Sequence, residues 1–152
     1  MPSRSENLLH SCIAFVLSVT LWGQGIPQRI VSQTVGTDEM LIDLVEPHRI
    51  AALSFLSTDP AYSDVAQEAR AFPQLKNGSA EQIIKFKPDL VLFSSYSRPE
   101  LVEQVRRTGI PILIFDRFDS LDDVYRNLRM LGKILHREAQ AVNTQFGQVR
   151  DR

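Results

Sequence analysis

The sequence predicts an α/β domain, with a Rossmann-like parallel sheet, helices on both faces and a single lobe that ends in a long helix. Two observations lead to this fold class. Short apolar runs alternate with amphipathic helical segments from residue 29 onward. Two of the runs, "DLVLFSS" (89–95) and "IPILIF" (110–115), are apolar without alternation, which is typical of strands covered on both faces.

The first half of the chain contains two further predicted strands. We expect them at 29–33 ("RIVSQ") and 49–54 ("RIAALS"), which are short apolar runs that end on polar residues. Between them, Thr37 is the expected N-cap of a helix over 38–45, whose acidic first turn suits the positive helix N-terminus. A short helix is expected around 62–70.

The second half of the chain carries clearer helix starts. Ser79, followed three residues later by Gln82, is a capping box that opens a short helix. Another helix separates the two fully apolar strands. Ser120 is then expected to cap a helical stretch that runs nearly to the end, with a break near Gly132 or His136.

Composition limits the function classes. With 152 residues, of which 43% are hydrophobic, the chain reads as one globular domain. Lys and Arg number 17 and Asp and Glu number 18, for a formal net charge of -1. The chain therefore lacks the overall basic charge that holds nucleic acid.

Residues 1–25 resemble a secretory signal peptide. A polar opening with Arg4 precedes an apolar run over 12–22, and small or polar residues follow at 23–25. The run is shorter than the roughly 20 residues that span a bilayer. Export to the periplasm is thus expected, with a membrane anchor or a buried first helix as the alternatives.

The carboxyl ends of the predicted strands are the expected binding site, because ligands of open parallel sheets bind outside those ends. Polar and aromatic residues follow four of the strands there. The candidate ligand-facing residues are Thr34, Phe55, Tyr96, Arg98, Arg117 and Phe118. In the simpler interpretation the two arginines are solvated and the two phenylalanines belong to the core.

Several segments, in this order, resemble the N-terminal lobe of the class III periplasmic binding proteins. These are the substrate-binding components of ABC importers for ferric siderophores, haem and cobalamin. The usual "TE" pair of the family reads Asp38-Glu39 here. The segments are "RIVSQTVGTDEMLIDLV", "RIAALS", "GSAEQIIKFKPDLVLFSS", "RRTGIPILIF" and "SLDDVYRNLRMLGKIL".

The resemblance implies a domain organisation. Residues 26–119 would form the N-terminal substrate-binding lobe, and 120–152 the region of the helix that connects two lobes. The C-terminal lobe would be absent from this apparently truncated sequence. In the family the ligand is held between the two lobes, so the missing lobe would supply half of the site.

The resemblance also implies partners, namely a ferric siderophore, haem or cobalamin-like ligand and the ABC permease subunits. Arginines beside aromatic residues suit an anionic, partly aromatic ferric chelate. The aligned loop positions lack the large aromatics expected around a corrin, because they hold Leu56, Leu75 and Ser94. Glu81 matches the glutamate that docks on the permease in this family. It would equally suit the positive end of its helix.

The sequence gives little evidence of a catalytic function. Phosphate-binding, nucleophile-elbow and zinc-binding motifs are not found, and neither a resident cofactor nor a metal site is predicted. The favoured interpretation is therefore a binding protein that is not an enzyme. The alternatives are a small Rossmann-like cytoplasmic domain that binds a nucleotide or acts enzymatically, and a non-functional remnant. The nucleotide-binding alternative would need a phosphate-binding loop, and the candidate segment "SQTVGT" holds only one glycine and no lysine.

Overall fold

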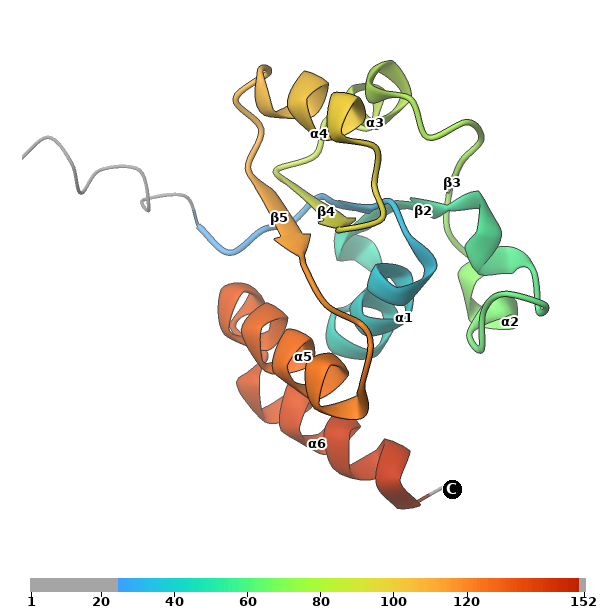
Figure 1. Ribbon diagram of the computed structural model, residues 1–152, viewed down its shortest axis with the longest axis vertical. Coiled ribbons are helices and arrows are strands. Elements are labelled where there is room, and N and C mark those ends of the chain that lie inside the picture. Colours follow the sequence, from blue (N-terminus) through green and yellow to red (C-terminus); the bar gives the residue numbers. More distant parts are fainter. Residues whose placement is uncertain (1–24, 151–152) are drawn as a thin grey trace, which may run out of the picture.

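The computed structural model describes residues 25–150, with side chains up to residue 144, so the predicted leader lies outside the described residues. Its centre is a five-stranded parallel sheet in the order β3-β2-β1-β4-β5 (Figure 1). The predicted parallel α/β fold is thus confirmed. The strands are β1 (Ile30–Ser32), β2 (Ile50–Ser54), β3 (Gln74–Leu75), β4 (Leu90–Ser94) and β5 (Ile112–Phe115).

Helices cover both faces of the sheet, as predicted. One hydrophobic core lies between the sheet and α1, α5 and α6, and a second lies between the sheet and α3 and α4. Figure 1 shows α5 and α6 together on one side and α3 and α4 on the other. None of the helices within residues 25–150 is long and apolar enough to cross a membrane. The helices are α1 (Val35–Leu44), α2 (Ala66–Ala69), α3 (Ala80–Lys85), α4 (Pro99–Arg106), α5 (Leu121–Leu135) and α6 (Glu138–Arg150), with short 3-10 helices at Pro47–Arg49 and Phe55–Thr58.

The two fully apolar runs differ in burial. All five residues of β4 are buried, as the absence of alternation predicted. The same prediction is wrong for β5, because only Phe115 is buried and Ile114 is exposed. β5 is the edge strand of the sheet and pairs only with β4. An edge strand has a neighbour on one side only, which leaves its outer face partly open to solvent.

Helix α1 begins earlier than predicted. Its N-cap is Thr34, and Thr37 occupies the third helical position instead of the cap. The two threonines form a capping box, with their hydroxyl oxygens 2.9 Å apart and the Thr34 N–H donating to Thr37 Oγ1 over 3.3 Å. The capping box at α3 is confirmed at the side chain of Ser79, which accepts the Gln82 N–H over 3.2 Å.

The predicted long terminal helix is two helices. His136 ends α5 with left-handed backbone angles (φ 55, ψ 47), so the break falls at one of the two expected positions. After it, α6 returns alongside α5 and also contacts α1 (Figure 1). Leu128, Leu131 and Leu135 from α5 and Ala141 from α6 are completely or almost completely buried in the same core. Both helices therefore contribute to the core on this face of the sheet.

We expect Gly132→Ala to lower the free energy of unfolding by about 1 to 3 kcal/mol, the usual cost of overpacking. A Cβ at Gly132 would lie 2.7 Å from Ala141 Cβ and 3.1 Å from the Arg137 carbonyl oxygen. In an uncrowded helix the same change stabilises by about 1 kcal/mol. Urea denaturation measures the sign. Adding Ala141→Gly should restore part of the loss, and a stabilising Gly132→Ala would contradict the close helix contact.

Candidate functional site

A cavity of about 460 Å³ opens at the carboxyl edge of the sheet, where the sequence predicted the site. Three strand ends and the start of α4 build it, since parallel strands bring their carboxyl ends to one edge. Its apolar wall holds four side chains that suit a partly apolar ligand. The lining residues are Gln33, Thr34, Val35, Ser54, Phe55, Leu56, Leu75, Asn77, Gly78 and Arg98.

Three of the six predicted ligand-facing residues line this cavity, namely Thr34, Phe55 and Arg98. Phe55 is 53% exposed although it is a large apolar side chain, as expected for a residue at the rim of a binding cavity. Tyr96 lies in the turn before Arg98 and is 73% exposed, but it is not among the lining residues. The structure thus brings together predicted residues from three different strand ends.

The remaining two predicted residues, Arg117 and Phe118, lie outside the cavity lining. The carbonyl oxygen of Arg117 accepts a 2.7 Å hydrogen bond from Asn127 Nδ2, which anchors the segment between β5 and α5. The ring of Phe118 meets Phe115 edge-on at 6.2 Å between centroids. A Cβ at Gly36 would lie 3.2 Å from the same ring, so a larger residue at position 36 would require the ring to shift by a few tenths of an ångström. Phe118 is partly buried and packs against the hydrophobic core.

Sequence reasoning missed two polar lining residues, Gln33 and Asn77. Gln33 directly precedes Thr34 at the end of β1, but it was not among the six predicted ligand-facing residues. Asn77 follows β3, a two-residue strand too short to be recognised by apolar periodicity. The turn sequence "KNGS" was the only available sign of a strand end there.

Polar side chains below the cavity are already hydrogen-bonded within the protein. The Thr34 and Ser32 hydroxyls lie 2.9 Å and 2.7 Å from Thr37 Oγ1. The Ser54 hydroxyl donates to Asp38 Oδ2, and the Ser54 N–H lies 3.2 Å from the same oxygen. These contacts tie the ends of β1 and β2 to the first turns of α1, and they position the cavity floor.

Asp38 is a buried carboxyl group beneath this edge. Burial raises the pKa of Asp38 to about 8, against the opposing effect of its hydrogen bonds to Ser32 and Ser54. The group is therefore mainly protonated at neutral pH. The sequence-based prediction that the first-turn acids only stabilise the helix N-terminus does not describe Asp38, because it points into the protein and bonds to β2.

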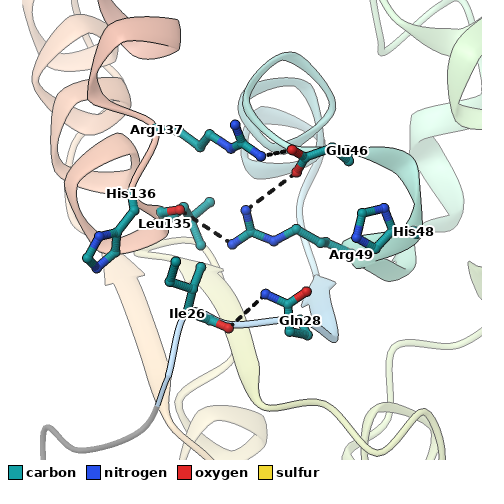
Figure 2. A pocket seen from close by; sticks show the side chains of 8 residues that line it. All are labelled: Ile26, Gln28, Glu46, His48, Arg49, Leu135, His136 and Arg137. Carbon is teal, nitrogen blue, oxygen red and sulfur yellow. Dashed lines mark hydrogen bonds and ion pairs between the residues drawn. The ribbon is translucent and has the colours of Figure 1, made fainter.

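A second cavity, of about 350 Å³, lies at the opposite edge, near the residues that precede β1 and β2 (Figure 2). Its charged groups are paired with one another. Figure 2 shows Arg49 and Arg137 both directed at Glu46, and Arg49 also donates to the Leu135 carbonyl. Arg49 Nε donates to the Pro27 carbonyl over 2.8 Å. These contacts occupy the guanidinium groups of both arginines. This second cavity, called the basal cavity below, is therefore a structural junction.

Within the part of the chain that the structure describes, His, Cys, Asp and Glu side chains form no cluster of three or more suited to a metal ion. Glu81 is exposed in the first turn of α3 and lies outside the lining of the carboxyl-edge cavity.

A family model described as periplasmic binding protein matches residues 30–146. The chain belongs to the periplasmic binding protein family. The match includes all five strands, both cores and the carboxyl-edge cavity, and it confirms the resemblance stated from the sequence. None of the curated proteins compared with the chain matches it.

Solved structures share the fold of this periplasmic binding protein. A periplasmic haem-binding protein from Pseudomonas aeruginosa aligns with a TM-score of 0.69 and 20% identity, over 82% of this chain and 44% of its own. The vitamin B12-binding protein of Vibrio cholerae aligns at 0.65 and 20% identity, over 83% and 49%. An Fe3+-hydroxamate transport protein from Saccharomonospora viridis aligns at 0.60 and 23% identity, over 83% and 49%. The chain thus spans less than half the length of these proteins.

Proposed function

We propose that this chain is the N-terminal lobe of the solute-binding component of an ABC importer, which is exported and binds a metal chelate without catalysis. The observation that carries the proposal is the cavity at the carboxyl edge, lined by Phe55 and by Arg98. Family membership over 30–146 and the named ligands of the structural neighbours support it. Residues 26–119 would carry the ligand wall and 120–152 would lead to a second lobe.

A ferric chelate of the siderophore or haem type is the ligand class that we favour. Arg98 has no ion-pair partner among the described residues, so its guanidinium is available to an anion. Phe55 and the exposed Tyr96 offer aromatic faces beside it. The wall formed by Leu56 and Leu75 is aliphatic, which suits a corrin less well than an aromatic wall would.

Binding by this lobe alone is expected to be weak, on the order of millimolar, because one wall buries only part of a ligand. Titration of the purified chain with haem, ferric siderophores and cobalamin, followed by NMR, tests the proposal. Binding to one of these chelates with shifts around Phe55 supports it. Failure of every chelate to bind would refute it, and so would shifts confined to the basal cavity.

Arg98→Ala is expected to weaken binding of an anionic chelate about tenfold, since charge-assisted hydrogen bonds contribute roughly 1.5 to 3 kcal/mol. Arg107→Ala is the matched control, because Arg107 is an exposed arginine at the end of α4 and outside the cavity. Equal affinities of the Arg98→Ala and Arg107→Ala variants would remove Arg98 from the site.

Glu81 is proposed as a contact to the permease. Its exposed position at the start of α3 leaves the carboxylate accessible to arginines of a partner. Site-specific photo-cross-linking from position 81 to reconstituted permease tests this role. A probe at exposed position 104 on α4 gives the background level. Equal cross-linking from the two positions would exclude the contact.

A further inference from the structure

Hydrogen-bond donors predominate among the polar side chains that line the carboxyl-edge cavity. None of its ten residues is acidic. The hydroxyl groups of Thr34 and Ser54 already bond to Thr37 and Asp38. Three polar side chains are left to meet a ligand, namely Gln33, Asn77 and Arg98. The orientation of their amide and guanidinium groups decides whether these three side chains offer donors or acceptors to a ligand.

The amide of Gln33 is oriented by the end of β4. Ser97 Oγ accepts the Ser94 N–H over 3.1 Å and donates its own proton to Gln33 Oε1 over 2.6 Å. The amide oxygen of Gln33 therefore already accepts a hydrogen bond, and its NH2 group points away from Ser97. Gln33 Nε2 lies 3.6 Å from the place that a Cβ on Gly78 would take, so this group lies against the turn after β3.

The amide of Asn77, in that same turn, is oriented in the same sense. Asn77 Oδ1 accepts the Ser79 N–H over 3.1 Å, and a backbone N–H can only donate. The backbone N–H of Asn77 itself donates to Gln82 Oε1 over 3.0 Å. The Nδ2 group of Asn77 is thus its one remaining donor. Together with Arg98, the lining thus offers N–H donors from three side chains, whereas the amide oxygens of Gln33 and Asn77 each already accept a hydrogen bond.

We propose that this cavity binds a carboxylate group of the ligand, held by the amide NH2 groups of Gln33 and Asn77 and by the guanidinium of Arg98. This inference rests on the proposed function and narrows its ligand to chelates that carry free carboxylates. A carboxylate is purely an acceptor and satisfies donors from several directions at once. Burial raises the pKa of Asp38, the hydrogen-bond partner of Ser54, to about 8, so this carboxyl group adds little negative charge at neutral pH. A chelate whose carboxyl groups are esterified or absent leaves these donors unpaired.

Paired probes test the proposal on the full chain. One pair is gallium(III) protoporphyrin and its dimethyl ester, and the other is gallium(III) citrate and a neutral gallium(III) trihydroxamate. Gallium(III) is diamagnetic, so the side-chain NH2 resonances remain visible by NMR. We expect the acidic member of at least one pair to bind about tenfold more tightly than its neutral counterpart. We also expect it to shift the NH2 resonances of Gln33 and Asn77.

Isosteric variants give an independent readout. Gln33→Glu and Asn77→Asp keep the oxygen that accepts from Ser97 or Ser79 and replace the donor by a carboxylate. Each should weaken an acidic chelate about tenfold and leave a neutral chelate within about twofold. Gln104→Glu, on the exposed side of α4, is the control for added charge alone.

The possible results separate this inference from the proposed function. Binding of neutral chelates alone would overturn the carboxylate site and leave the solute-binding function standing. Binding of acidic chelates without shifts at Gln33 and Asn77, or with no greater loss in the two variants than in the control, would do the same. If none of the four probes nor cobalamin binds, the proposed function fails and the inference fails with it.

Discussion

Arg49→Met is expected to lower the free energy of unfolding by about 2 to 3 kcal/mol, because the change removes one partner of a buried ionic junction. Arg49 is 3% exposed. Its guanidinium donates to the carbonyl oxygens of Pro27 and Leu135, over 2.8 Å and 3.5 Å, and its Nη1 lies 3.6 Å from Glu46 Oε2. One side chain thus joins the segment before β1, the turn before β2 and the end of α5.

Denaturant titration of two matched variants measures this contribution. Methionine keeps most of the volume of Arg49, so the loss reports the polar contacts more than a new cavity. Arg107→Met is the control, because Arg107 has a 77% exposed side chain that pairs with Glu103 across 3.0 Å on the surface. Such exposed pairs contribute about 0 to 1 kcal/mol. Equal losses in the two variants would contradict a structural role for the junction in Figure 2.

Asp38→Asn is expected to remove a large part of the pH dependence of stability. The folded protein raises the pKa of Asp38 from the ordinary value of 3.8 to about 8, chiefly through burial. Between these two values the folded state keeps the proton and the unfolded chain releases it. The free energy of unfolding therefore falls as pH rises, by about 1.4 kcal/mol per pH unit. From pH 5 to pH 7 the wild type should lose about 3 kcal/mol through this group.

The asparagine variant carries no ionisable group at this position and mimics the protonated carboxyl. It should be more stable than the wild type at pH 7, with the difference shrinking toward pH 4. Burial also raises the pKa values of Glu39 and Asp43, whose contributions have the same sign but cancel between the two proteins. Asp122→Asn, at an exposed position, is the control. Parallel stability curves for wild type and Asp38→Asn would contradict a buried neutral carboxyl group.

The two cavities show why chemistry and shape must be considered together. Both are comparable in volume, at about 350 and 460 Å³. The arginines of the basal cavity are held by Glu46 and by carbonyl oxygens, so they have little left for a ligand. In the carboxyl-edge cavity, the side-chain N–H groups of Gln33, Asn77 and Arg98 form no hydrogen bond to another side chain within the described residues. This difference in hydrogen-bonding chemistry supports the choice of the carboxyl-edge cavity as the proposed ligand site.

Local sequence patterns were sufficient for the parallel α/β fold and for part of the site. The apolar run of β4 required burial on both faces, the Ser79 capping box started α3, and strand ends pointed to Thr34, Phe55 and Arg98. These features depend on residues close together in the chain. Propensity and periodicity describe such short-range preferences well.

Long-range packing decided what the sequence alone did not determine. β5 became an edge strand, the ring of Phe118 packed against the core beside Gly36, and α6 folded back beside α5 at Gly132. Asn77 joined the site through a strand of two residues, and Asp38 became a buried, neutral carboxyl group. Each outcome depends on which surfaces meet in space. Neighbours along the chain carry little information about such contacts, because burial and hydrogen-bond partners are set by segments far apart in the sequence.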